Sequence, residues 1–245
     1  MISGGNELYN TLKSHTKEFH QVVKFNPVSE KIISFDLSEN NIELKKMNTE
    51  DIDEFSKYIF GKLKMHNAKF GYGGYNELRL LYSRSNLFDN NLIGKEKPEI
   101  VEEPRRLHIG VDIWGIDGTP VYAPLDGRVH SFAYNDHLGD YGATIILSHQ
   151  VNNISFHTLY GHISLYDIKN LKEVNFIRRG QLFAHFGKPE ENGHWPPHLH
   201  FQIIKDINTY HGDYPGVSKF SEREKYLLNS PDPDVILNMK KLLQP

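Results

Sequence analysis

The stretch LHIGVDIW, residues 107–114, opens a series of short β-branched segments that indicates the fold. The series comprises LHIGVDIW (107–114), TPVYAPL (119–125), GRVHSFAY (127–134), ATIILSH (143–149), ISFHTLYGH (154–162), FIRRGQLFAHFG (176–187) and HLHFQII (198–204). β-Branched residues favour extended backbone, and Gly, Pro, Asn or Asp separates each segment from the next. Seven such segments in succession predict an antiparallel sheet or barrel-sandwich.

The N-terminal part of the chain has a different pattern. Apolar residues recur at near-helical spacing over residues 6–24 and again along Ile52, Phe55, Ile59 and Leu63, where Asn48 or Thr49 is the expected N-cap. Between these two predicted helices, the polar SENN turn within residues 32–44 predicts a hairpin.

The sequence therefore predicts an α+β protein in two parts. Residues 1–104 form a helix-rich N-terminal region that packs on the core, and they end in the charged, proline-containing linker KEKPEIVEEP at 95–104. Residues 105–245 form the β barrel-sandwich, followed by short helices near 221–228 and after the SPDPD turn.

Composition argues against several classes of function. The 245 residues carry 28 Lys and Arg against 31 Asp and Glu, which is not the basic bias of a protein that tracks duplex nucleic acid. The chain has no Cys, which excludes disulfides, thiolate catalysis and iron–sulfur clusters. No secretory signal pattern is visible, and apolar runs such as 143–147 are far shorter than the roughly 20 residues that a membrane span needs. We expect a cytoplasmic protein with no nucleic-acid partner and no membrane span, whose oligomeric state has no signal in the sequence.

Histidine is the unusual component of this composition. Eleven of the 14 His residues fall between His108 and His211. Neutral imidazole is the commonest metal ligand in proteins and a frequent acid–base group. The clustering therefore directs attention to the β segments.

Alternation along LHIGVDIW places His108, Gly110 and Asp112 on one face of an extended segment. An imidazole and a carboxylate with Gly between them, leaving room for an ion, make a plausible half-site for Zn²⁺. A structural hydrogen bond between the two side chains is an equally good interpretation of this segment alone.

The segment HLHFQII places His198 and His200 on one face as well. Two aligned imidazoles are costly to bury without partners, and a metal ion would supply them. Pro196 and Pro197 restrict the approach to this strand, which suits a preorganised site.

A third histidine comes from the segment TLYGHIS. His157 and His162 are five residues apart and thus lie on opposite faces of a strand, so only one of them can share the site. His162 is the better candidate, because it follows Gly161 and is expected to be exposed there. His157 is predicted to be structural. No HExxH pattern is present, which excludes thermolysin-type zinc chemistry.

Five motifs occur in a characteristic order. They are HIGVD (108–112), GTPVYAPLDGRV (118–129), TLYGHIS (158–164), GQLFAHFG (180–187) and PPHLHF (196–201). In order and spacing, this set resembles the lysostaphin/LytM family of zinc metallo-endopeptidases, whose core is a barrel-sandwich known as the duplicated hybrid motif. The resemblance covers residues 105–204.

The resemblance implies a role for each candidate. His108, Asp112 and His200 become the zinc ligands, and His162 and His198 become the catalytic pair beside the metal. It implies a zinc-dependent endopeptidase that cleaves short peptides of the peptidoglycan cross-link or muropeptide type. The loop GKPEENGHWPPHLHF is longer than the family pattern, which leaves substrate preference open; His194 within it is expected to be a solvent-exposed loop residue.

Two other functions compete with this interpretation. One is a non-catalytic binding or regulatory module of the same fold, and the other is a barrel-sandwich phosphocarrier that uses a pair of histidines. The complete set of candidate ligands and catalytic histidines disfavours the first, and Asp112 has no role in the second. Residues 72–84 hold several Tyr and Arg side chains that could line the cleft and restrict it to small soluble peptides, although packing and turn formation also explain them.

Overall fold

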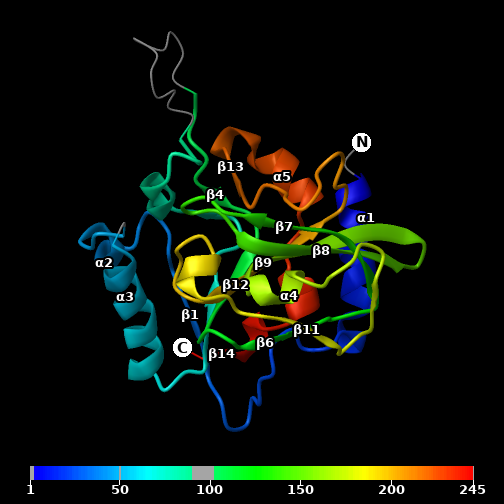
Figure 1. Ribbon diagram of the computed structural model, residues 1–245, viewed down its shortest axis with the longest axis horizontal. Coiled ribbons are helices and arrows are strands. Elements are labelled where there is room, and N and C mark those ends of the chain that lie inside the picture. Colours follow the sequence, from blue (N-terminus) through cyan, green and yellow to red (C-terminus); the bar gives the residue numbers. More distant parts are fainter. Residues whose placement is uncertain (1–2, 50, 90–101, 245) are drawn as a thin grey trace.

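The computed structural model of the protein describes residues 3–49, 51–89 and 102–244 (Figure 1). Most of the predicted linker at 95–104 lies outside these residues. Nine strands form the main sheet, in the order β10 (Phe176–Ile177), β7 (Gly127–Asn135), β8 (Gly142–Val151), β9 (Ile154–Ile163), β12 (His198–Ile204), β5 (Val111–Trp114), β2 (Phe70–Gly73), β1 (Ile32–Ser34) and β14 (Leu243–Gln244).

Two smaller sheets accompany the main one. The first pairs β11 (Leu182–His185) with β6 (Pro120–Tyr122), and the second has the order β13 (Val217–Ser218), β4 (Leu107–His108) and β3 (Glu77–Leu78). The helices are α1 (Ser3–Ser14), α2 (Ile42–Lys45), α3 (Ile52–Met65), α4 (Leu165–Ile168), α5 (Arg223–Asn229) and α6 (Asp234–Leu237). Short 3₁₀ turns cover Thr16–Glu18, Leu80–Arg84, Pro189–Glu191, Phe220–Glu222 and Lys240–Leu242.

The predicted α+β class is confirmed, but the barrel-sandwich is not. Within the described residues no sheet closes on itself, and β10 and β14 are the edges of the main sheet. Beyond β5, the main sheet is completed by strands from the N-terminal and C-terminal parts of the chain, because β1 pairs in parallel with both β2 and β14. The N-terminal region is thus not simply helical, since it supplies three strands as well as α1, α2 and α3.

Two local predictions in this region were wrong. The helix expected over 6–24 ends at Ser14, where the hydroxyls of Ser14 and Thr16 donate to backbone carbonyls of the last turn. The hairpin expected at 32–44 does not form, because Asn41 caps α2 by accepting from the backbone N–H groups of Glu43 and Leu44.

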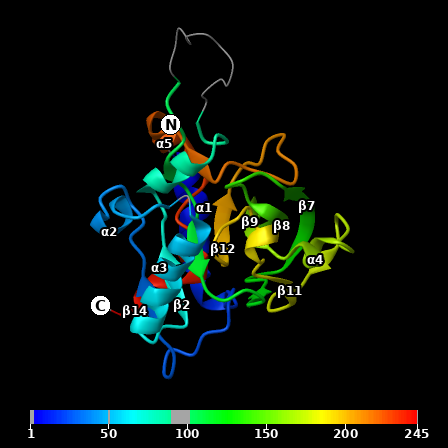
Figure 2. The ribbon, with the colours of Figure 1, turned by 60° about the vertical axis from the view of Figure 1, so that its left-hand side comes forward.

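The second predicted helix is present as α3, with Asp51 as its N-cap in place of Asn48 or Thr49. Its stripe of Phe55, Ile59 and Leu63 is buried against a cluster that includes Trp114 and Trp195. In Figure 1, α3 lies on one side of the strands and α1 on the other, and Figure 2 shows α3 beside β2, which it contacts. Leu8 and Leu12 of α1 join the main apolar core between the strands and the C-terminal helices. The two-part organisation itself stays a prediction.

No helix in the described part of the chain has the length and apolar character required to cross a bilayer.

Candidate metal centre

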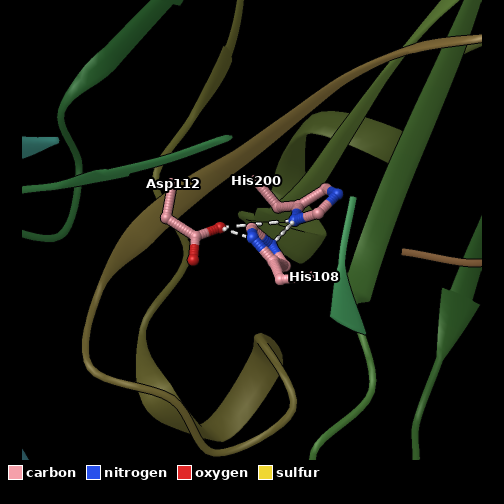
Figure 3. Close-up of side chains that lie close together, drawn as sticks. All are labelled: His108, Asp112 and His200. Carbon is pink, nitrogen blue, oxygen red and sulfur yellow. Dashed lines mark hydrogen bonds and ion pairs between the residues drawn. The ribbon is translucent and has the colours of Figure 1, made fainter. Parts of the chain in front are cut away.

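Strand pairing brings His108, Asp112 and His200 together from three strands. Asp112 on β5 and His200 on β12 are direct cross-strand partners, while His108 lies on β4 of a different sheet. LHIGVDIW is therefore not one continuous strand but two short ones, separated at Ile109 and Gly110. All three functional side chains are buried and point toward one another (Figure 3).

The three potential ligand atoms form a compact triangle. His108 Nε2 lies 2.9 Å from His200 Nδ1, and each of these nitrogens lies 3.3 Å from Asp112 Oδ1. Ligands at about 2.0–2.1 Å from a tetrahedral Zn²⁺ are about 3.3–3.4 Å from one another. The two edges to Asp112 match one face of such a tetrahedron, and the edge between the two nitrogens is about 0.4 Å shorter than the ideal.

Hydrogen bonds on the far side of each ring determine which nitrogens carry lone pairs. His108 Nδ1 donates to the carbonyl of Gly74 at 2.7 Å, which leaves Nε2 unprotonated in the neutral ring. His200 Nε2 donates to Gln202 Oε1 at 3.0 Å, which leaves Nδ1 as the unprotonated nitrogen that carries a lone pair. The Gln202 orientation is fixed because its amide nitrogen donates to the carbonyl of Pro215.

Three acceptor atoms thus face each other with no donor between them. Two nitrogen lone pairs 2.9 Å apart, together with a carboxylate oxygen, repel one another unless a cation lies between them. This donor set, each member of which is held by a second hydrogen bond, is the arrangement that a metal ion requires. It is also the only group of three or more suitable residues within the described chain that meets the distance requirement for a metal.

Asp112 has an additional partner, Arg79. The Arg79 guanidinium donates to Asp112 Oδ2 at 2.6 Å and to Glu77 Oε2 at 2.6 Å, and its side chain is 2% exposed. Burial opposes ionisation of Asp112, but the adjacent His108 and Arg79 hold the pKa of this carboxyl well below its usual range. Burial, together with the positive charge of Arg79, lowers the pKa of His108 to about 4. At neutral pH the site therefore offers an ionised carboxylate and a neutral imidazole.

Gly110 has a different function from the one expected. A Cβ on this residue would lie 2.4 Å from the His200 ring, so Gly110 leaves room for the imidazole of His200 rather than for an ion.

His198 and His162 lie directly beside the triangle. His198 Nε2 is 3.8 Å from Asp112 Oδ1, and the His198 and His162 ring centroids are 4.2 Å apart. His198 stacks on Trp114 at 3.9 Å and donates from Nδ1 to the carbonyl of Pro196. Burial lowers the pKa of His198 to about 4, and burial followed by the nearby His198 holds the pKa of His162 well below its ordinary value.

His162 is held in a specific conformation. Its φ of +61° lies in the left-handed region, and hydrogen bonds from its own N–H to Tyr141 and from Gly187 N–H to its carbonyl maintain this geometry. Its Nδ1 donates to the carbonyl of Asn192, whose side chain in turn ties together the loop before β12. The residue is buried, not exposed as expected, because the space beside Gly161 is filled by the Tyr141 ring.

The remaining sequence candidates lie elsewhere. His157 faces His130 at a ring-centroid distance of 5.0 Å, away from the triangle, and His194 is an exposed loop residue. Tyr72 and Tyr75 bond to Asp234 and to the carbonyl of Ser230, away from the cleft. Within the segment 72–84, Arg79, Leu81 and Tyr82 do line the cleft.

The triangle opens into a cavity of about 210 Å³. His162, His198 and Trp195 line it on the β-core side, and the N-terminal region supplies Leu81, Tyr82, Leu87 and Phe88. The sequence singled out Arg79 only as one of several cleft candidates, and it offered no signal for Gly74 or Asn192 as partners of the histidines, because both accept through backbone carbonyls. Gln202 lies two residues after His200 on β12, so strand alternation places both on one face, and this signal was available in the sequence.

Comparison with known proteins identifies a family and several similar proteins. Residues 106–212 match the family described as peptidase family M23, which confirms the family resemblance. The chain is 32% identical over half of its length to an uncharacterised metalloprotease of Haemophilus influenzae, covering 25% of that protein. It is 30% identical over 42% of its length to an L-Ala–D-Glu endopeptidase of Bacillus subtilis, covering 31% of that protein. Among solved structures, the catalytic domain of lysostaphin from Staphylococcus simulans shares 24% identity, with 71% of this chain and 96% of that one covered and a TM-score of 0.42.

The chain spans between a quarter and a third of the length of these two curated relatives.

Proposed function

We propose that the chain, whose residues 106–212 match peptidase family M23, is a zinc-dependent endopeptidase that cleaves short peptides of the peptidoglycan cross-link or muropeptide type. The observation that carries this proposal is the set of three mutually facing acceptor atoms on His108, Asp112 and His200. A match to an endopeptidase family and a curated relative named as an L-Ala–D-Glu endopeptidase support the reaction class.

His108, Asp112 and His200 would hold the zinc ion. Three protein ligands are the number typical of catalytic rather than structural zinc. When bound, zinc lowers the pKa of a coordinated water toward ~7 and polarises a carbonyl group. The buried Arg79, Gln202 and Gly74 keep the ligands oriented without occupying their donor atoms.

His162 and His198 would act as the acid–base pair. Both donate from Nδ1 to backbone carbonyls, so that each neutral ring keeps Nε2 as a proton acceptor. Their lowered pKa values keep both rings neutral at pH 7, which is the form that accepts a proton. Stacking on Trp114 restricts the orientation of His198.

The N-terminal region would restrict the substrate. Leu81, Tyr82, Leu87 and Phe88 line the cavity, so that an extended polymer must displace them whereas a small soluble peptide need not. We therefore expect higher activity on soluble muropeptides than on intact sacculi. Replacing Phe88 with Ala should raise the sacculus-to-muropeptide activity ratio by about fivefold, equivalent to roughly 1 kcal/mol. An unchanged ratio would remove this part of the proposal.

The experiment that tests the function combines metal analysis with digestion. Purified protein is analysed for zinc and incubated with cross-linked muropeptides, and the products are identified by mass spectrometry, with His200→Ala as control. One zinc per chain and new peptide termini in the wild type alone are expected. Zinc binding without cleavage of any peptide would favour the non-catalytic binding module instead.

A further inference from the structure

Two of the three candidate metal ligands are oriented by residues outside the family-matched segment. Strand β2 runs antiparallel to β5 with Gly73 opposite Asp112, and β3 runs antiparallel to β4 with Glu77 opposite His108. The segment 70–79 therefore lies alongside 107–114 over its whole length. Its central turn faces the point where LHIGVDIW passes from one sheet to the other.

We propose that Arg79, supplied by this N-terminal segment, is a positioning residue that presents Asp112 to the metal through a single oxygen. This inference rests on the proposed metal-dependent function. It gives the N-terminal region a role in orienting a candidate metal ligand, in addition to lining the cavity.

The contacts of Arg79 explain how it would do so. One arm of the guanidinium donates to Asp112 Oδ2 at 2.6 Å, and Oδ1 is left facing both His108 and His200 at 3.3 Å. A carboxylate whose Oδ2 is held by Arg79 cannot rotate to present both oxygens to a metal ion. Arg79 therefore selects Oδ1 as the single metal-binding oxygen of Asp112. Glu77 accepts from Arg79 Nε at 2.6 Å and thereby fixes the plane of the guanidinium.

Burial makes this pairing strong. Arg79 and Asp112 are each 2% exposed, and water does not compete for either group. Together, the side chains of Glu77, Arg79 and Asp112 carry one net negative charge. The site therefore still attracts a cation, although a guanidinium lies within it. Outer partners of metal ligands typically change metal affinity by about 10–100-fold when removed.

Gly74 supports the same arrangement on the histidine side. Its carbonyl accepts from His108 Nδ1, its φ is +100°, and a Cβ here would lie 1.9 Å from an Arg79 nitrogen and 2.9 Å from His108 Nδ1. Only glycine permits both the conformation and the close approach. His108 and Asp112 thus both depend on residues 74–79 for their orientation.

The test measures metal affinity and coordination in the full-length chain. Zn²⁺ affinity is determined by competition with a chromogenic chelator, and Co²⁺ is substituted so that its visible absorption bands report the ligand geometry. Arg79→Met should weaken Zn²⁺ binding by about 10–100-fold and shift the Co²⁺ bands. Arg79→Lys should weaken binding less, because the ammonium restores the charge beside Asp112 but cannot also reach Glu77 in a fork.

Arg106→Met provides the matched control. Arg106 pairs with Asp89, so that it also joins the core to the N-terminal region, but it touches none of the three ligands. It should lower thermal stability and leave Zn²⁺ affinity and the Co²⁺ spectrum unchanged. Equal losses of affinity in Arg79→Met and Arg106→Met would mean that Arg79 only holds the region in place, and the proposal would fall.

Two further outcomes are distinguishable. If Arg79→Met does not fold by circular dichroism, Arg79→Lys decides: a wild-type affinity and spectrum in that variant overturns the positioning role, and a change in both supports it. If the wild-type chain binds no metal at all, the proposed function itself fails, whereas wild-type binding combined with unaffected Arg79 variants overturns this inference alone.

Discussion

The molecule contains two groups of histidines that differ in how their rings are held. The central group consists of His108, His162, His198 and His200, and the outer group of His130, His157 and His211. Three rings of the central group donate from Nδ1 to a backbone carbonyl, and the fourth donates to Gln202. In the central group, the nitrogens of three rings lie within 3.8 Å of the shared carboxylate of Asp112.

The outer group lacks this organisation. His130 bonds to the hydroxyl of its neighbour Ser131, and His211 pairs with Glu173 where both side chains are exposed. His157 Nδ1 is buried without a hydrogen-bond partner in the described structure. The ring centroid of His130 lies 5.0 Å from that of His157 and 6.1 Å from that of His211, and within the described residues these three rings do not form a metal-ligand group with a carboxylate. Histidine clustering alone therefore does not identify a candidate metal centre; the central group is distinguished by its shared carboxylate and by ring nitrogens fixed through hydrogen bonds.

The largest effect is expected from His200→Ala. This change removes the ligand that joins β12 to the other two donors, and two remaining ligands rarely retain zinc in dilute solution. Zinc content after dialysis against a mild chelator should fall from one per chain to none, with complete loss of peptidase activity. Stoichiometric zinc in this variant would contradict the ligand assignment.

Within the central group, His162→Ala and His198→Ala should separate chemistry from metal binding. Each should retain zinc and lose about 10²–10⁴-fold in kcat, the usual contribution of a positioned acid–base group. Metal analysis and single-turnover kinetics on the same preparations provide the check. Loss of zinc in His198→Ala together with its retention in His200→Ala would reverse the roles of these two residues.

A buried histidine outside both groups, His149, should contribute to the loss of stability in acid. His149 donates to the carbonyl of Asp126 and contacts the hydroxyl of Thr158, and burial lowers its pKa to about 4. The unfolded chain has an ordinary histidine pKa of ~6.5 and binds a proton first as pH falls, so stability present above ~6.5 is lost between that value and about 4.

Replacing His149 with Gln should remove this contribution. Between pH 7.5 and pH 5, the wild type should lose about 2 kcal/mol more unfolding free energy than His149→Gln. Urea titrations at the two pH values, at equal metal loading, measure the difference. Parallel losses in both proteins would show that His149 does not account for the acid sensitivity.

The smallest effect is expected from the outer group. The paired change His130→Asn and His211→Asn should leave zinc affinity within about twofold of the wild type, because neither ring contributes to the central triangle. The same chelator competition that tests His200→Ala serves here. A second zinc equivalent in the wild type, lost in this double variant, would contradict the distinction between the two groups.

The sequence was sufficient to predict the β segments and the residues of the central group. HxH reports two side chains on one face of β12, because strand alternation is a local property of the backbone. The apolar stripe of α3 was visible for the same reason. HxxxD singled out two residues that do meet, but His108 lies on β4 and Asp112 on β5, so alternation along one strand does not place them. The local predictions that failed, the long first helix and the hairpin, failed where Ser14, Thr16 and Asn41 bond to nearby backbone instead of continuing a periodic element.

Only the tertiary structure decided what surrounds those side chains. His108 meets His200 across 92 residues of chain, and Arg79 and Gly74 reach Asp112 and His108 across 33 and 34. Strands β1 and β14, far apart in the sequence, extend the main sheet beyond β2. Periodicity carries no information about which distant strands pair or in what register. The sequence could therefore single out the candidate ligands, but strand pairing determined which oxygen of Asp112 faces the histidines and which residue holds the other.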